Sequence, residues 1–553
     1  MMKHEAETAG PLVSAEQIFF FDHPHEAPAR GLESLLGGKG AGLAEMTRAL
    51  GLPVPPGFTV ALPVCRAYRE GGWPADLDGA LRASMAELGA RMGRKFGDPA
   101  DPLLVSVRSG APVSMPGMLD TILNLGLTDE TVLGLARASG DERFAWDTYR
   151  RFLAMYASIV LEVPGEAFPG FDDGTDASVS LPESVQRLKA HIEEVSGRQV
   201  PQDPYVQLHE AVKAVFCSWD SSRARAYRSA EGIQEDMGTA VNVQAMVFGN
   251  RGPESGTGVV FTRNPSTGHR QLYGDYLPRA QGEDVVAGTA KTLPVGYLAE
   301  HTPRAHRELM RALRALETHY RDMCDVEFTV EDGKLWVLQT RIGKRGAVAA
   351  VRCATHMVND LHIGLTPEEA VARVPFEVRE RARQEVLAAA EVSDASEPVL
   401  DVGLGASPGR VSGRVVLTAD EAADAEDDVI LVRPETSPED VPAMAASVGV
   451  LTTRGGLVSH AAVVARGWGI PAVVGAHNLT ITAEGFTNTS GVLVRAGDTI
   501  TIDGATGRVW LGELQTTGSE RASDQILDNE LPELALLEQW AADLKNRKGT
   551  ADA

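Results

Sequence analysis

Residues 325–341, DVEFTVEDGKLWVLQTR, have the pattern of a β-hairpin. Two runs rich in β-branched, aromatic and other apolar residues flank the turn-forming pair Asp332–Gly333. Successive side chains of a strand point to opposite faces, so Asp325 and Glu327, two positions apart, share one face of the first strand. The stretch therefore predicts a sheet that carries a pair of carboxylates on one face.

The second strand carries a matching polar pair, Gln339 and Arg341. A two-residue Asp332–Gly333 turn would place the two pairs on opposite faces. A three-residue loop that begins at Glu331, with its glycine left-handed, would place all four side chains on one face. We predict the three-residue loop, because it separates the polar residues cleanly from an apolar side. That apolar side would consist of Val326, Phe328, Val330, Trp336 and Leu338.

The polar face of this hairpin would have the groups that a nucleotide phosphate requires. Asp325 and Glu327 could bind Mg²⁺, which takes hard oxygen ligands and fills its remaining positions with substrate phosphates. Gln339 and Arg341 would supply an amide and a guanidinium for phosphate. The alternative is an edge hairpin whose polar face is only solvated.

Two further stretches could bind phosphate. In LLGGKGAGLAEM, residues 35–46, a glycine-rich turn places Lys39 just before a helical pattern, where backbone can approach an anion. This is not a Walker A loop, because Gly40 follows the lysine, and a plain structural turn is the alternative. In residues 103–127 an apolar strand delivers Arg108 to its end, before a Ser-Met-Pro-Gly-Met loop. Its guanidinium suits phosphate, the alternative being a surface ion pair.

Residues 454–475, RGGLVSHAAVVARGWGIPAVVG, place His460 between a glycine pair and an apolar helix. Ser459 is a natural N-cap, so His460 would occupy the first helical position, where the dipole favours the negative charge of a phosphohistidine. Gly455–Gly456 would clear room for a phosphate, and Arg454 could neutralise it. A neutral imidazole is a good nucleophile near pH 7. From the residues alone, a histidine packed in a core remains the alternative.

The composition is that of a globular protein. The chain has 553 residues, 43% hydrophobic and 23% charged, and a net charge of −24 that argues against nucleic acid as a partner. Four scattered cysteines predict a reduced compartment and no structural zinc. No signal peptide and no apolar run long enough to span a membrane are found, so we expect a cytoplasmic protein that does not bind membranes.

The pattern along the chain predicts several domains in a mixed α/β and α+β protein. We expect a nucleotide-binding domain at 1–341 with a peripheral, turn-rich excursion at about 164–204. A helical linker follows at 342–395, then a glycine-punctuated β domain at 396–515. The tail, 516–553, ends in an amphipathic helix, ELALLEQWAADLKNR, that packs on its own chain, docks a partner or forms a homo-oligomer.

Motifs spread over the whole chain resemble the pyruvate, phosphate dikinase family. The arginine loop favours the phosphate-using branch over the water-using relatives. The motifs are GGKGAGLAEM, LPVPPGF, SVRSGAPVSMPGMLDTILNLG, FAWDTYRRF, GTAVNVQAMVFGN, SGTGVVFTRNPSTG, AQGEDVVAG, VEFTVEDGKLWVLQTR and ETSPEDVPAM followed by LTTRGGLVSHAAVVARGWG.

The resemblance implies an ATP-grasp-like nucleotide-binding domain, a helical linker and a swivelling phosphohistidine domain. It implies that His460 is phosphorylated, with Arg108, Arg341 and Lys39 assisting catalysis, and that Asp325 and Glu327 bind Mg²⁺. The residues that it implies for ATP are Lys39, Arg108, Gln244, Thr257, Glu283, Gln339 and Arg341.

Three departures from the family pattern are visible. Val458 stands where plant members have a regulated threonine, so that switch is absent, although Ser459 remains. GIPAVVG replaces the usual cysteine-containing segment and looks more like the water-using relatives. The chain stops about where a second linker should lead into the family's pyruvate- and phosphoenolpyruvate-binding barrel, so we expect the barrel to be absent.

The leading hypothesis is therefore a phosphotransferase that uses ATP, phosphate and Mg²⁺ to phosphorylate its own His460, giving AMP and pyrophosphate. The phosphoryl group would pass to pyruvate through a separate barrel protein, or to another acceptor. Two alternatives are direct phosphorylation of a different small metabolite and a nucleotide sensor without turnover. All the expected site residues are present, which disfavours the sensor.

Overall fold

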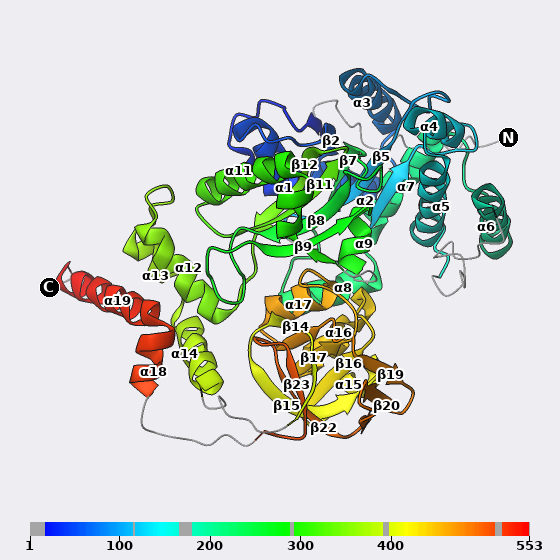
Figure 1. Ribbon diagram of the computed structural model, residues 1–553. Helices are drawn as coiled ribbons and strands as arrows, with labels where there is room; N and C mark the ends of the chain where they lie inside the picture. Colours follow the sequence, from blue (N-terminus) through cyan, green and yellow to red (C-terminus); the bar gives the residue numbers. More distant parts are fainter. Residues whose placement is uncertain are drawn as a thin grey trace, which may run out of the picture. The chain divides into compact units, whose positions relative to one another are not determined.

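The computed structural model describes residues 17–113, 115, 117–164, 180–287, 292–390, 398–514 and 523–551. The chain divides into two compact units. The first comprises Met1–Arg251 with Trp336–Gln339, and the second comprises Gly252–Leu335 with Thr340–Ala553. Each unit combines helices and sheets, as the mixed α/β prediction required (Figure 1).

The first unit is built on a five-stranded antiparallel sheet with the strand order β1-β2-β7-β5-β6. Two of its inner strands, β2 and β7, are buried at every position, including the polar Asn242 and Gln244 of β7. A short parallel pair, β3 and β4, lies apart from this sheet. The strands are β1 (Ile18–Phe20), β2 (Gly57–Val60), β3 (Lys95–Phe96), β4 (Pro102–Leu103), β5 (Val105–Gly110), β6 (Thr121–Leu125) and β7 (Ala240–Ala245).

Helices complete the core of the first unit. The predicted excursion contains α6, whose Val185, Leu188 and Ile192 are fully buried in the same apolar cluster as the central sheet. The expectation that this helix is peripheral is wrong, because its apolar face packs on α5. Residues 165–179 of that excursion lie outside the described residues. The helices are α1 (Glu33–Ala44), α2 (Leu62–Gly71), α3 (Leu77–Met92), α4 (Thr131–Ser139), α5 (Glu142–Ile159), α6 (Leu181–Ser196), α7 (Pro204–Ser218) and α8 (Ser222–Glu231).

The second unit begins with a five-stranded sheet of order β10-β9-β8-β11-β12. Its strands β8, β9 and β11 form an antiparallel core from which the predicted carboxylate pair projects. The elements are β8 (Gly256–Phe261), β9 (Tyr273–Pro278), β10 (Leu293–Pro294), β11 (Cys324–Glu331), β12 (Lys334–Ile342), α9 (Gly282–Ala287), α10 (Leu298–His301) and α11 (Pro303–Tyr320).

The part of the chain that contains His460 is built on an eight-stranded sheet of order β13-β23-β22-β15-β16-β17-β18-β14. Its four central strands, β15 to β18, are parallel, and α17 follows β17. The strands are β13 (Val399–Val402), β14 (Leu404–Ser407), β15 (Arg410–Val416), β16 (Val429–Arg433), β17 (Gly449–Thr452), β18 (Ala472–Val474), β22 (Thr499–Asp503) and β23 (Arg508–Leu511). A separate three-stranded sheet contains β19 (Leu479–Thr482), β20 (Gly485–Asn488) and β21 (Leu493–Arg495). The helices are α15 (Ala419–Ala423), α16 (Val441–Ala446) and α17 (His460–Trp468).

The stretch predicted as a helical linker is helical. It forms α12 (Ala347–Asn359), α13 (Pro367–Arg373) and α14 (Phe376–Ala390). The tail forms α18 (Ser523–Glu530) and α19 (Pro532–Ala551), which lie against the linker helices (Figure 1). Leu534 and Leu537 of α19 are buried in one apolar cluster with Val351 and Ala354 of α12, so the tail helix packs on its own chain.

None of the helices within the described ranges combines the length and the apolar character that crossing a membrane requires.

Candidate functional site

The predicted hairpin is present, but its turn is shorter than expected. Asp332 and Gly333 alone form the turn, both left-handed, with φ of 47° and 75°. The three-residue loop is therefore the wrong prediction. Two consecutive left-handed residues make a tight turn whose twist matches the paired strands, and aspartate tolerates that conformation nearly as well as asparagine does.

The shorter turn also changes the apolar side of β12. Leu335 and Val337 are fully buried, whereas Trp336 and Leu338 are only partly buried. The apolar side predicted for the second strand is thus wrong by one position. The first strand agrees with the prediction, since Val326, Phe328 and Val330 are fully buried. That part of the prediction is the same for either turn length.

Arg341 nevertheless meets both predicted metal ligands. Its Nε donates to Asp325 Oδ2 at 2.9 Å, and its Nη2 donates to Glu327 Oε1 at 3.0 Å. The other oxygen of Asp325, Oδ1, is buried and has no hydrogen-bond partner among the described residues. Burial raises the pKa of Asp325, with Glu327 adding to that effect and Arg341 opposing it. The negative charges of Asp325 and Glu327 would attract a cation that bound beside them.

A second group of predicted residues is assembled in the first unit. Arg108 Nη1 donates to Gln244 Oε1 at 3.5 Å, and its Nη2 donates to Gln339 Oε1 at 3.2 Å. The amide of Gln244 is held in place by its own bond to the carbonyl of Pro55 at 3.0 Å. Arg108 lies within β5 rather than at its end, and Ser114 and Pro116 of the following loop lie outside the described residues.

Lys39 lies inside α1, two residues beyond a break in that helix. Gly37 makes the break, with φ 69° and ψ 162°, so the predicted turn is a kink between two helical segments. A methyl group at Gly37 would lie only 1.8 Å from the carbonyl oxygen of Gly110, which ends β5. Lys39 Cβ lies 3.5 Å from the point where a Gly110 side chain would begin. The kink therefore sets Lys39 beside β5, the strand that carries Arg108.

The remaining two predicted ATP residues lie together in the second unit. Thr257 on β8 is buried, and its hydroxyl donates to the carbonyl of Phe328 at 3.1 Å. Glu283 lies in the first turn of α9, and a side chain at Gly282 would begin 3.9 Å from Thr257 Oγ1. The start of α9 therefore adjoins Thr257.

His460 is the first residue of α17, as predicted. Its Nδ1 lies 3.0 Å from Thr436 Oγ1, while Nε2 is buried without a hydrogen-bond partner among the described residues. Burial lowers the pKa of the imidazole, and the carboxylates of Asp440 and Glu439 partly oppose this shift. The arrangement favours a neutral ring with one nitrogen fixed and the other uncommitted. Ser459 occupies the N-cap position, but its side chain makes no capping bond.

The loop before His460 is tied to the β9 strand of the same unit. Asp275 Oδ2 accepts the Val458 N–H at 3.3 Å, and Thr292 donates to Oδ1 at 2.9 Å. A methyl group at Gly456 would lie 2.3 Å from Asp275 Oδ2, so the glycine allows this approach. Burial raises the pKa of Asp275, and the bonds from Thr292 and the loop oppose it. Arg454 is exposed.

Two of these residues were missed by the sequence analysis. Thr436 stands in the quoted motif ETSPEDVPAM, where its hydroxyl was not assigned a role. Asp275 interrupts the apolar strand sequence YGDYL, and a carboxylate between buried strand residues is the signal that could have identified it.

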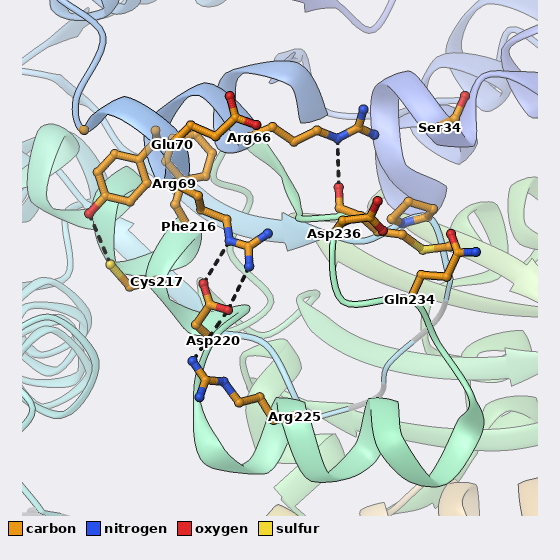
Figure 2. Close-up of a pocket in the computed structure, with 14 residues that line it drawn as sticks. Ser34, Arg66, Arg69, Glu70, Phe216, Cys217, Asp220, Arg225, Gln234 and Asp236 are labelled. Atoms are coloured by element: carbon orange, nitrogen blue, oxygen red, sulfur yellow. Dashed lines mark hydrogen bonds and ion pairs between the residues drawn. The ribbon is translucent and has the colours of Figure 1, made fainter. Parts of the chain in front are cut away.

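A cavity of about 1150 Å³ in the first unit is lined by none of the predicted site residues (Figure 2). Arg69 there forms a two-bond ion pair with Asp220 at 2.9 and 3.0 Å, and Arg225 approaches the same carboxylate at 3.8 Å. Its three arginines are balanced by Glu70, Asp220 and Asp236. The cavity therefore has no net charge that would select a phosphate.

No group of three or more histidine, cysteine, aspartate or glutamate side chains that could hold a metal occurs in the part of the chain that the structure describes. A metal at Asp325 and Glu327 would take its other ligands from substrate or solvent, which is the usual manner of Mg²⁺ in nucleotide sites.

Comparison with known proteins matches two different families of domain to two parts of the chain that hold most of the predicted residues. Residues 66–294 and 300–359 match the pyruvate phosphate dikinase AMP/ATP-binding domain, and residues 425–507 match the mobile domain of PEP-utilising enzymes. The pyruvate, phosphate dikinases of Rhizobium meliloti and Clostridium symbiosum are each 47% identical, over 88% of this chain and 57% of their own. Pyruvate, phosphate dikinase 2 of Oryza sativa is 44% identical over 97% of this chain and 61% of its own. The chain thus spans about 57–61% of the length of these relatives.

The kink at Gly37 generates a test. Gly37→Ala should lower the free energy of unfolding of the first unit by about 2–4 kcal/mol, because the methyl group meets the Gly110 carbonyl and the residue is left-handed. It should also weaken ATP binding, since Lys39 must move. Denaturant unfolding and calorimetric ATP titration measure the two effects. Gly31→Ala is the matched control, because a methyl group there meets no atom within 4 Å; equal behaviour of the two variants would contradict the account.

Proposed function

Because the chain belongs to the pyruvate, phosphate dikinase family, we propose that it is a phosphotransferase that charges its own His460 from ATP and phosphate. The β-phosphoryl group of ATP passes to the imidazole and the γ-phosphoryl group passes to inorganic phosphate, so that AMP and pyrophosphate leave. The observation that carries the proposal is the setting of His460: it is first in its helix, with Nδ1 beside Thr436 and Nε2 without a hydrogen-bond partner among the described residues, and burial lowers its pKa.

Nε2 of His460 is the proposed nucleophile. In the proposed tautomer the Nδ1–H donates to the Thr436 hydroxyl, 3.0 Å away, which leaves the Nε2 lone pair in the ring plane for attack on phosphorus. Phosphorylation adds negative charge at the first position of α17, where the unpaired N–H groups of the helix stabilise it. Charge formed on the histidine therefore needs no arginine immediately beside it.

Mg²⁺ fits the carboxylate pair. The buried and unpartnered Oδ1 of Asp325 is an oxygen that a cation would satisfy, and Glu327 supplies a second carboxylate. Bound there with ATP, the ion would neutralise phosphate charge. Arg341, which holds both carboxylates, would orient them and face phosphate as they bind metal.

The other family-matched residues are proposed to bind ATP. Arg108 presents a planar guanidinium oriented by two buried amides, those of Gln244 and Gln339, and Lys39 adds a point charge from the kinked helix. Thr257 and Glu283 would complete the nucleotide contacts. Holding the phosphates in line and neutralising their charge supplies most of the catalysis in phosphoryl transfer.

The final acceptor is proposed by family resemblance alone. Residues 1–341 would form the ATP-grasp-like domain, 342–395 the linker and 396–515 the swivelling phosphohistidine domain. The histidine domain would move between the nucleotide and an acceptor, pyruvate being the leading one.

Isotopic labelling tests the charging reaction. Purified protein is incubated with Mg²⁺, with ATP labelled separately at the β and γ positions, with and without phosphate. With phosphate present we expect acid-labile label on the protein from the β position only, and we expect labelled pyrophosphate only when phosphate is present. His460→Ala should abolish the protein-bound label while ATP binding is retained. Tight ATP binding without any label on wild-type protein would refute the proposal.

The environment of His460 generates a pH prediction. Burial disfavours the imidazolium, so the neutral nucleophile should persist to lower pH than in an exposed histidine, and its titration midpoint should lie below the ordinary value of 6.5. Glu439→Gln should lower the midpoint further, because that carboxylate raises the pKa. NMR titration of the ring, assigned with His460→Asn, measures this. A midpoint at or above 6.5 in wild-type protein would show that burial does not set the pKa of the imidazole.

A further inference from the structure

The C-terminal end of α17, the helix that begins at His460, lies beside cations from another part of the second unit. α17 ends at Trp468, and left-handed Gly469 follows it with φ 70°. The last carbonyls of a helix lack internal partners and carry partial negative charge. The helix's own Arg466 donates to the carbonyls of Ala406 and Leu457, both at 3.0 Å, which lie outside α17.

Two cations from outside the histidine domain lie against this end. A methyl group at Gly467 would be 2.7 Å from Lys344 Nζ, and one at Gly469 would be 2.7 Å from Arg381 Nη1. Lys344 precedes the first linker helix, α12, and Arg381 lies on α14 of the same linker. Both glycines therefore leave room for a linker cation at the negative end of the helix.

The contact at Arg381 lies beside open space. Arg381 and Gly469 line a cavity of about 1190 Å³ in the second unit, together with Glu385 of α14 and with Arg410 and Asp503 of the histidine domain. Charge rather than close apolar packing thus joins α14 to the end of α17 at this point. Contacts of this kind can be broken and remade without exposing a core.

We propose that Lys344 and Arg381 are positioning residues, a pair of linker cations that holds the C-terminal end of α17 and thereby sets where His460 points. This inference rests on the proposed function of His460. Nine helical residues form a rigid rod of about 13 Å, so a shift at one end moves the other. The histidine end is held separately, by the Val458 N–H that donates to Asp275. The helix is therefore fixed at two polar points.

The test uses the full chain with Lys344→Gln, Arg381→Gln and the double variant. Hydrogen exchange of the Val458 amide reports the hold at the histidine end without any phosphorylation. We expect exchange to rise about two- to fivefold in each single variant and about tenfold in the double variant, the size of a cation effect at a helix end. The rate of His460 labelling should fall by similar factors, with the KM for ATP unchanged.

Two controls separate positioning from general effects. Arg381→Lys keeps the charge and should restore wild-type exchange, and added salt should bring wild-type exchange toward that of the double variant. Arg495→Gln removes an exposed charge on β21 and should change nothing.

The outcomes distinguish the two proposals. Raised exchange in the double variant, with no label on wild-type His460, would support the cation pair and refute the charging reaction. Normal labelling with unchanged Val458 exchange in every variant would refute the cation pair and leave the charging reaction standing. If the double variant melts at a lower temperature than wild type, the exchange rates of the single variants decide between these outcomes, because each single variant removes only one exposed charge.

Discussion

A histidine can accept a phosphoryl group only while one ring nitrogen holds a free lone pair, and the role proposed for His460 depends on that state. Burial disfavours the imidazolium, and the Thr436 hydroxyl occupies Nδ1. The helix start supplies the positive partial charge that the product needs. The loop before the ring is tied to Asp275, which accepts the Val458 N–H and which Gly456 allows to approach.

The carboxylates of Asp325 and Glu327 are two acidic groups held close together on a buried strand. Burial raises the pKa of Asp325, with the neighbouring Glu327 carboxylate adding to that effect, and Arg341 opposes the rise by bonding both acids. In the proposed function, this compensated pair would attract a cation once phosphate draws the arginine away. In the first unit, Arg108 donates to the neutral amides of Gln244 and Gln339.

Local sequence rules predicted the parts of this site that depend on local structure. The hairpin, the helix start at His460 and the linker helices follow from periodicity and turn residues, and all are present, although Ser459 makes no capping bond. The turn at Asp332 was wrong because the choice was made on face polarity, whereas the left-handed tolerance of aspartate decided it. Thr436 and Asp275 could not be assigned, because each meets its partner across 24 or 183 residues of chain. The depth of α6 in the core was missed because turn-rich flanks conceal a buried helix face.

The nitrogen that carries the phosphoryl group is the most direct test of the central claim. Protein labelled with ¹⁵N-histidine is incubated with ATP, Mg²⁺ and phosphate, and phosphorus–nitrogen coupling is read by NMR. The account predicts one phosphohistidine, at His460, linked through Nε2 and lost in His460→Ala. A phosphoryl group on Nδ1, or on any other residue, would contradict the assignment of Thr436 and of the helix start.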